Sequence, residues 1–389
     1  MIKCDVAVVG AGPIGSMAAK YAAKNGADTL LIEEHQEIGA PVACAGIIST
    51  RALDECEIGL GRWINREVKG AFIYSPNGHS IAVGGNETRA YVIERKAFDQ
   101  ELARQALKTG VDILLKTRAV GLKNRVLEVV SYGERLEIEA DIVIGADGVK
   151  SQVARWAALG NVKKVLGGVQ IEGLYELRNP GFVEVFIGPV APGFFAWTIP
   201  VEDGIARVGL CATARPFHHF RTMLKSHPVI SKRYHGSYLD FVVGGIPLGP
   251  PEQTTADGVM LVGDAAGQVK PTSGGGIYTG ALCAKVAGEV AAAAVSEGDT
   301  SAKRLAEYEK RWRSAIWREL SIGMKIHEAM GKLSDSDFDR IIRTLDDTGI
   351  LGIISQYGDM DYPSAVVKKL ILAKPSLLRL SGVLAKALR

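Results

Sequence analysis

Cysteine is scarce in this sequence, and the few that occur are dispersed. No two of them are spaced as a CxxC pair, and the five positions are Cys4, Cys44, Cys56, Cys211 and Cys283. An odd, scattered set argues against a disulfide framework and fits a reducing cytosol. It also lacks the clustered ligands of a structural zinc or an iron–sulfur centre, so we predict no metal site.

Two further absences narrow the class of function. The formal net charge is only +3 and no basic stripe is interleaved with aromatic residues, so nucleic acid is not an expected partner. No apolar stretch reaches the roughly 18 residues of a spanning helix; the run 286–295 comes closest, and Glu289 interrupts it. The N-terminus passes directly into a strand, so we expect no signal peptide. These features predict a cytoplasmic protein that is at most peripheral at a membrane.

The chain opens on a βαβ pattern. Residues 3–9 read as a short, buried, valine-rich strand, helix signals follow from Gly12 to Asn25, and a second strand covers about 29–34. The length of 389 residues indicates two or three domains.

The remaining chain alternates between strand-like and helical segments. Strand patterns occupy 68–93, 111–116, a hairpin at 119–139, a buried strand at 140–146, most of 162–248 and a buried strand at 258–267. Helical patterns occupy 95–109, an insert at 216–234, 276–296 and the charged region from Ser301 onward.

The first chemical motif is a GxGxxG, made of Gly10, Ala11, Gly12, Pro13, Ile14 and Gly15. It directly follows a buried strand and opens a helix, the placement that lets a helix N-terminus face a pyrophosphate. Glu33 lies 23 residues after Gly10, where an acid binds ribose hydroxyls. The alternative is a glycine-rich turn with a surface glutamate, but the full order of strand, glycines, helix and acid favours dinucleotide binding.

Two weaker motifs follow other buried strands. Asp264 follows one of these strands, and its carboxylate could accept hydrogen bonds from a ribityl chain. The glycine-rich turn Gly274–Gly276 comes next and would let a helix N-terminus face the pyrimidine edge of a flavin. An aspartate N-cap with a flexible loop is an equal alternative. Asp147 and Gly148 form the other motif, which alone is best explained as an ordinary turn.

Together the three motifs resemble the glutathione-reductase-like FAD superfamily, in its para-hydroxybenzoate-hydroxylase-like branch. The resemblance covers most of 1–296 and implies FAD, with Arg95 near the pyrophosphate or, alternatively, a solvated charge at a helix start. The implied cofactor-binding set is Gly10, Ala11, Gly12, Pro13, Ile14, Gly15, Glu33, Glu34, Ala45, Gly46, Arg95, Val120, Asp147, Asp264, Gly275, Gly276 and Ile277.

The implied fold is α/β, with a Rossmann-type FAD-binding domain, an inserted, mainly antiparallel β substrate domain and a C-terminal helical region. The expected boundaries are 1–67, 94–160 and 250–300 for the FAD-binding domain, 68–93 and 161–249 for the β domain, and 301–389 for the helical region.

Two segments resemble the geranylgeranyl reductases. Residues 41–49 are similar to a Cys-x-Gly stretch beside the flavin, and 192–200 are similar to a PxxYxWxFP signature in which Phe195 replaces the tyrosine and Ile199 the second aromatic. The resemblance implies that Cys44 lies at the flavin face, as proton donor or in positioning the ring; an inert buried cysteine is an equal alternative.

Alternating aromatics support a substrate wall. Phe195, Trp197 and Ile199 face one side of a strand, and Phe186 could extend the wall they form, although a sandwich core is an equal alternative on pattern alone. The resemblance to the geranylgeranyl reductases implies FAD-dependent reduction of isolated C=C bonds in geranylgeranyl chains, as in archaeal-type membrane ether lipids. The donor is unidentified and could be NAD(P)H, ferredoxin or a similar carrier.

Two other functions stay open, an FAD-dependent aromatic or isoprenoid hydroxylase using NADPH and O2, and a non-catalytic prenyl-lipid-binding flavoprotein. The segment 368–389 predicts an amphipathic helix, which is either packed on the body or, less favoured, laid on an anionic membrane as a peripheral contact.

Overall fold

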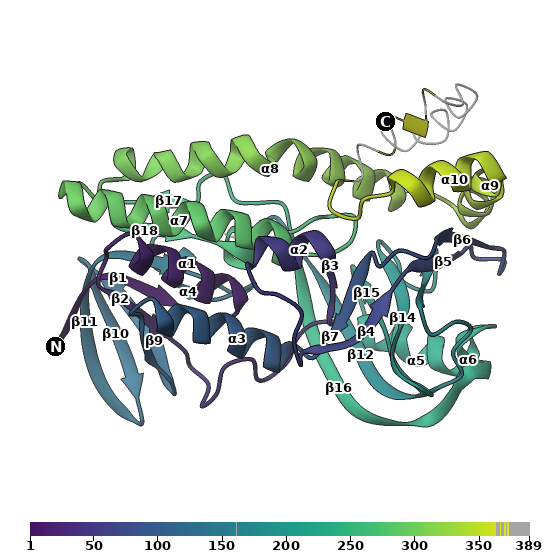
Figure 1. The fold of residues 1–389 in the computed structure, drawn as a ribbon, viewed down its shortest axis with the longest axis horizontal. Coiled ribbons are helices and arrows are strands. Elements are labelled where there is room, and N and C mark those ends of the chain that lie inside the picture. Colours follow the sequence, from purple (N-terminus) through teal and green to yellow (C-terminus); the bar gives the residue numbers. More distant parts are fainter. Residues whose placement is uncertain (161, 363–365, 367–368, 371, 373–389) are drawn as a thin grey trace.

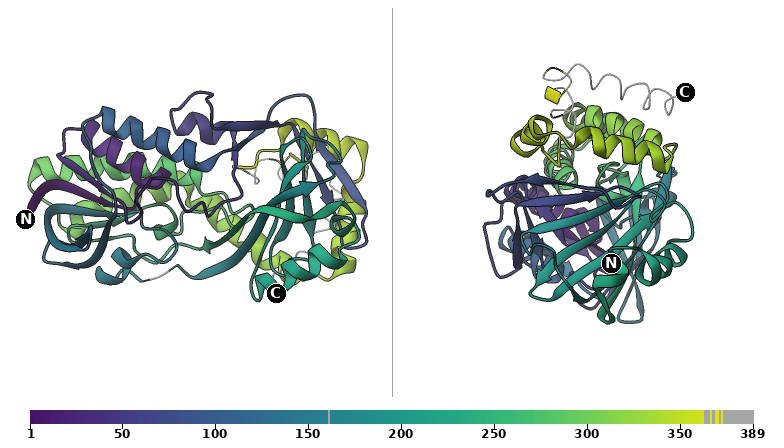
Figure 2. Two further views of the ribbon diagram at one scale, coloured as in Figure 1. Left: turned by 90° about the horizontal axis from the view of Figure 1, so that it is seen from below. Right: turned by 90° about the vertical axis from the view of Figure 1, so that its right-hand side faces the viewer.

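The computed structural model of this chain describes residues 1–389 except 161, 363–365, 367–368, 371 and 373–389. The molecule is elongated, with one large β-sheet in each half and a layer of helices along one side of both (Figures 1 and 2). The N-terminus lies at the outer end of the first half. The predicted amphipathic helix over 368–389 lies almost entirely outside the described residues.

The first sheet is built around the parallel strands of the opening βαβ unit. Its main path runs β17-β18-β11-β1-β2-β8, and β1 pairs in parallel with β11 and with β2. Val6, Ala7 and Val8 of β1 are fully buried, as expected for a central strand that is covered on both faces. The strands are β1 (Ile2–Val9), β2 (Thr29–Ile32), β8 (Asp112–Leu114), β11 (Glu134–Gly145), β17 (Thr255–Ala256) and β18 (Val259–Leu261), with a hairpin of β9 (Thr117–Lys123) and β10 (Val126–Ser131) off this path.

Helices cover one face of this sheet, and the hairpin covers the other. The helices are α1 (Pro13–Lys24), α3 (Arg95–Lys108) and α7 (Ile277–Glu297), whose buried side chains share one core with Val6 and Val8. Leu127 and Val129 of β10 and Val153 of α4 (Gln152–Trp156) form the core on the opposite face.

Two predicted strands need correction. The strand expected at 140–146 is not separate, because β11 runs without a break from Glu134 to Gly145. The segment 258–267 is strand only over β18 and then turns into a 3-10 helix, η1 (Gly263–Ala266). Gly263 and Gly267 adopt φ of 67° and 63°, a left-handed conformation that ends the strand and that glycine adopts readily.

The prediction that no stretch is long and apolar enough to span a membrane is wrong for helix α7. By length and composition alone, its 21 residues meet that criterion. However, 61% of its most apolar window is buried inside the protein. A Cβ on Gly288 would lie 2.6 Å from the Ala18 carbonyl oxygen, so α7 packs directly against the backbone of α1. This burial is that of a core helix.

The second sheet is mainly antiparallel and runs β16-β12-β15-β14-β13-β5-β6. Phe220 and Met223 of α5 (Pro216–Ser226) pack into the core on one of its faces. The strands are β5 (Gly70–Tyr74), β6 (Ser80–Gly84), β12 (Lys164–Tyr175), β13 (Phe182–Ile187), β14 (Phe195–Glu202), β15 (Ile205–Ala212) and β16 (Tyr234–Leu248). A three-stranded sheet of β3 (Ile47–Ser49), β7 (Ala90–Ile93) and β4 (Ile64–Val68) lies between the two halves.

The C-terminal helices join the halves. The long helix α8 (Ala302–Met330) is fixed to the first sheet through Tyr308, whose hydroxyl donates to the Leu261 carbonyl at 2.7 Å. At the other end of the molecule, Ser355 of α10 (Thr348–Tyr357) accepts from the Gly84 amide of β6 at 3.0 Å. The remaining helices are α2 (Thr50–Glu55), α6 (Ile230–Arg233) and α9 (Asp335–Leu345).

Candidate active site

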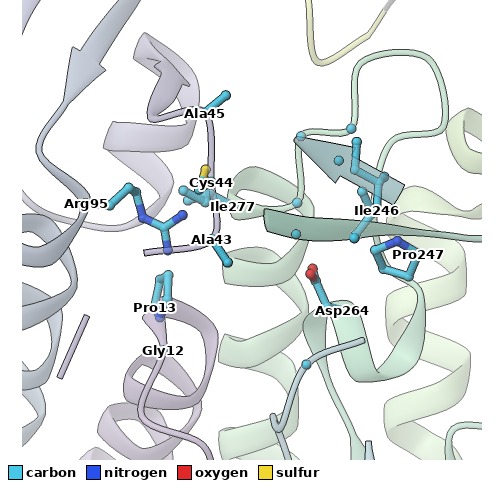
Figure 3. Close-up of a pocket in the computed structure, with 18 of the residues that line it drawn as sticks. Gly12, Pro13, Ala43, Cys44, Ala45, Arg95, Ile246, Pro247, Asp264 and Ile277 are labelled. Atoms are coloured by element: carbon cyan, nitrogen blue, oxygen red, sulfur yellow. The ribbon is translucent and has the colours of Figure 1, made fainter. Parts of the chain in front are cut away.

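A cavity of about 1390 Å³ runs from the carboxyl ends of the first sheet to the inner face of the second. It is larger than the roughly 300–1,000 Å³ of an ordinary small-molecule pocket. Its wall contains nearly all the residues that the motifs single out, although they come from distant parts of the chain (Figure 3). The cavity therefore has room for two ligands side by side.

The GxGxxG turn forms one end of the cavity. Gly10 has φ +100°, and a Cβ there would lie 2.5 Å from the Ala146 carbonyl oxygen; a Cβ on Gly15 would lie 1.8 Å from the Gly10 oxygen. Gly12 differs, because its φ of −66° suits any residue and nothing lies within 4 Å of its Cβ position. Gly10 and Gly15 thus serve the packing of α1, whereas Gly12 leaves open space at the helix N-terminus, where an anion is favoured.

The two acidic positions after β2 differ in their surroundings. Glu33 lines the cavity and accepts a hydrogen bond from the Ala11 amide at 2.9 Å and another from the His35 amide at 3.0 Å. Ala11 itself is buried and does not line the cavity, so its amide supports Glu33. Glu34 and Val120 both lie on the wall.

Asp147 lies on the wall but has a local structural role. Its carboxylate accepts from the Ser151 hydroxyl at 2.6 Å, from the Gln152 amide at 2.7 Å and from the Val153 amide at 3.1 Å. These bonds satisfy the first turn of α4. The Asp-Gly turn therefore fixes the edge of the cavity beside the first glycine motif.

The second glycine-rich turn brings another helix N-terminus to the cavity. Gly275, Gly276 and Ile277 line it where α7 begins. Asp264 points into the same space, and no hydrogen bond to its carboxylate comes from the part of the chain that the structure describes. Burial raises the pKa of the Asp264 carboxyl to about 6, although Arg95 acts in the opposite direction. This carboxylate is an acceptor directed at whatever fills the cavity.

The pKa of Asp264 predicts how the stability of the FAD-free protein depends on pH. An acid whose pKa is raised by folding binds more protons in the folded state, so the free energy of unfolding falls as pH rises from about 4 to about 6. We expect Asp264→Asn to remove this fall and to raise the unfolding free energy at neutral pH by about 1–3 kcal/mol. Urea unfolding of both FAD-free proteins across this pH range measures the effect. An undiminished fall in the variant would contradict it.

Cys44 lies on the wall between the two glycine turns, beside Arg95 (Figure 3). Its sulfur accepts from the Gly46 amide at 3.3 Å. Arg95 forms two hydrogen bonds of 3.0 Å with Asp99. Burial opposes the charge of Arg95, but Asp99 and the Cys44 sulfur outweigh it and raise the pKa of the guanidinium. A permanent cation therefore stands next to this thiol, which the sequence could not show.

Two side chains from the second sheet hold the Cys44 loop, and sequence reasoning missed both. Arg207 donates to the carbonyl oxygens of Ala45 at 3.2 Å and Ile93 at 3.0 Å. Gln170 donates to the Cys44 carbonyl at 3.4 Å and accepts from the Trp197 indole at 2.8 Å. These pairs are 27 or more residues apart, and no local pattern indicates them.

Gly46 does not line the cavity, although Ala45 does. A Cβ at this position would lie 1.9 Å from Nη1 of Arg207. Gly46 thus makes room for the bracing arginine. Cys211, a second thiol on the wall, is buried, and burial raises its pKa to about 12.

The inner face of the second sheet supplies an apolar wall. Phe195, Trp197 and Ile199 of β14 all line the cavity, as their alternation predicts. The neighbouring strands add aliphatic side chains, namely Ala71, Ile73, Val183, Val185 and Ile187. This part of the cavity suits a hydrocarbon ligand.

The prediction that Phe186 belongs to this wall is wrong. In the β13–β14 register Val185 pairs with Trp197 and Phe186 with Ala196, so Phe186 points to the opposite face. There it is 1% exposed and stacks on Tyr74 with ring centroids 4.7 Å apart. The residue types do not reveal the register that decides this.

A buried ion pair lies beside the second glycine turn. Lys270 pairs with Asp361, and their side chains are 9% and 1% exposed. Asp361 also accepts from the Ser49 hydroxyl at 2.6 Å. Both charged residues line the cavity, so the segment after α10 closes one side of it. The partners are 91 residues apart, and the sequence gives no signal for the pair.

Comparisons with known proteins agree with this geometry. A family model described as "FAD binding domain" matches residues 3–212, more than half of the chain. A digeranylgeranylglycerophospholipid reductase of Methanothrix thermoacetophila is 40% identical over 360 residues, which cover 88% of this chain and 92% of that protein. A protein of the same name from Methanocaldococcus jannaschii is 37% identical over 394 residues, covering 96% of each.

Solved structures share the fold. The crystal structure of a geranylgeranyl bacteriochlorophyll reductase-like protein from Thermoplasma acidophilum has a TM-score of 0.86 at 29% identity and covers 98% of this chain and 100% of that chain. A p-nitrophenol 4-monooxygenase of Pseudomonas putida has a TM-score of 0.69 at 17% identity, covers 96% of this chain and 98% of that one, and shows the fold alone. The predicted fold class is confirmed.

Proposed function

The chain belongs to the digeranylgeranylglycerophospholipid reductase family of FAD-binding oxidoreductases, and on this premise we propose how its cavity is used. The protein catalyses the FAD-dependent reduction of isolated C=C bonds in the geranylgeranyl chains of archaeal-type membrane lipids. One observation carries the assignment to this cavity. The space beside two helix N-termini continues, within one cavity of about 1390 Å³, to the apolar wall of β13 and β14. We call the part of the cavity at Ile73, Val183, Val185, Phe195 and Trp197 the aliphatic chamber.

The residues present fit FAD. The open space at Gly12 and the N-terminus of α1 suit the pyrophosphate, and Glu33 stands where a ribose would lie. Asp264 would offer its carboxylate to the ribityl hydroxyls, and the N-terminus of α7 at Gly276 would suit the electron-rich pyrimidine edge of the flavin. Ala11, Asp147 and Gly46 support these positions through the hydrogen bonds and packing described above.

An isolated C=C bond is unpolarised, so the reaction needs a hydride on one carbon and a proton on the other. Reduced FAD supplies the hydride. Phe195, Trp197 and the aliphatic side chains of β13 hold the chain and exclude water. Cys44 is our candidate for the proton donor, since its thiol lines the cavity and Gln170 links its carbonyl to Trp197 of the apolar wall. Arg95, which Asp99 fixes, stabilises the thiolate left after transfer.

Reduction and hydroxylation are distinguished by their products. We expect chemically reduced, FAD-loaded protein to convert a geranylgeranyl phospholipid under argon into products heavier by two hydrogens for each bond reduced. Mass spectrometry of extracted lipid measures this. Product that forms only with O2 and carries a hydroxyl group would instead establish a hydroxylase, the function left open above. Bound but unchanged lipid would establish a non-catalytic lipid-binding flavoprotein.

Turnover needs an electron donor and access to lipid. We infer that a reduced nicotinamide, a ferredoxin or a similar carrier reduces the flavin, and that the enzyme works in the cytoplasm at the membrane surface. The lipid nature of the substrate supports this location, because a chain of this kind resides in a bilayer.

A further inference from the structure

An exposed apolar cluster lies on the outer side of the second sheet. We call it the docking patch, and its members, each between 42% and 76% exposed, are Phe217, Tyr238, Leu239, Phe241 and Val243. Phe241 connects α5 with β16, because its ring centroid is 6.2 Å from those of both Phe217 and Tyr238. A contiguous apolar surface of this kind is uncommon on a protein that works alone in water.

Four of the five patch residues, all except Phe217, lie on β16, a strand that also lines the cavity. Val242, Gly244 and Ile246 of β16 line the cavity, whereas Phe241 and Val243, on either side of Val242, are exposed. In the order of the second sheet, β16 is a terminal strand, and it lies with α5 and α6 at the outer side of the second half (Figures 1 and 2). The patch and the space proposed for the lipid chain therefore share one strand, β16.

The surroundings of the patch are basic. Between Cys211 and Pro250 the sequence has five Lys or Arg and a single acid, Asp240. Arg233 pairs with Glu184, while the other four basic side chains, Arg215, Arg221, Lys225 and Lys232, are exposed. We call these four side chains the basic rim; the guanidinium carbon of Arg221 is 5.9 Å from the Phe217 ring centroid, and the other three lie on or beside α5 and α6. Exposed apolar side chains with basic ones on the same elements match a membrane interface that carries negative charge.

We propose that the docking patch and its basic rim bind the enzyme to the surface of an anionic lipid bilayer, next to the cavity that receives the lipid chain. The biological role of this membrane binding rests on the proposed function, although the binding itself does not require turnover. A second copy of the chain fits the patch less well. In a symmetric dimer the same basic rim would face itself, and like charges would oppose association.

The test uses FAD-loaded protein and vesicles without any prenyl lipid. We expect wild type to sediment with phosphatidylglycerol vesicles and much less with phosphatidylcholine vesicles. Leu239→Ser combined with Val243→Ser should weaken binding to phosphatidylglycerol at least about tenfold. Changing Arg215, Arg221 and Lys225 to Gln should weaken it by about fivefold for each charge. Leu107→Ser combined with Tyr132→Ser is the matched control, since both residues are exposed and belong to elements that pack around the first sheet, α3 and the end of β10.

Three results would overturn the proposal that the docking patch binds a membrane. They are equal binding of wild type to both vesicles, unchanged binding of the Leu239/Val243 variant, and a change in its oligomeric state without a change in vesicle binding. The last would identify a subunit interface. Protein that binds vesicles through the patch but reduces no lipid leaves this inference standing and removes the proposed function.

Discussion

Gly12→Asp is expected to lower the affinity for FAD at least about 100-fold, a loss of about 2.7 kcal/mol of binding free energy. The new side chain would enter the open space that we assign to the pyrophosphate, where it adds both bulk and negative charge. The folded chain should tolerate it, because Gly12 is the N-cap of α1 with an extended backbone, and aspartate is a preferred N-cap residue. Equilibrium titration of the FAD-free protein with FAD gives the affinity.

The controls separate binding from folding. Gly59→Asp makes the same change in charge at an exposed position with nothing within 4 Å of its Cβ, and it should bind FAD like wild type. Gly15→Ala should instead destabilise the protein, since its Cβ would lie 1.8 Å from the Gly10 oxygen. Thermal unfolding of the FAD-free proteins distinguishes these effects. If Gly12→Asp bound FAD with wild-type affinity, the pyrophosphate would not lie at this helix.

Val185→Asp is expected to reduce kcat/KM for a detergent-dispersed geranylgeranyl lipid by about 100-fold or more, while FAD remains bound. Val185 lies in the aliphatic chamber and pairs across the sheet with Trp197. A carboxylate there must lose its water when the hydrocarbon enters, which costs several kcal/mol, at least about 3. Initial rates across a range of lipid concentrations, together with flavin content, measure the effect.

Val185→Ile is the matched control, because it keeps the wall apolar at nearly the same volume. It should retain activity within about tenfold of wild type. Full activity of Val185→Asp, with FAD bound and the protein folded, would place the prenyl chain elsewhere in the molecule.

The sequence predicts best where local chemistry decides the structure. The strand–glycine–helix order around Gly10 to Gly15 requires close backbone packing, so the placement of α1 against β1 follows from it. The alternation of Phe195, Trp197 and Ile199 likewise fixes which side chains share a face of β14.

The sequence predicts poorly where distant segments decide the structure. The pairing register that turns Phe186 away from the cavity depends on how β13 meets β14. The Lys270–Asp361 pair and the brace from Arg207 to the Cys44 loop join segments 91 and 162 residues apart.

The central claim is that one cavity holds the flavin and the alkene side by side, so that hydride passes directly between them. Rapid mixing of reduced, FAD-loaded protein with geranylgeranyl lipid under argon tests this most directly. The flavin absorbance should return to its oxidised form at a rate that depends on lipid, with one C=C bond lost for each flavin oxidised. Flavin that stays reduced in the presence of bound lipid would contradict the claim.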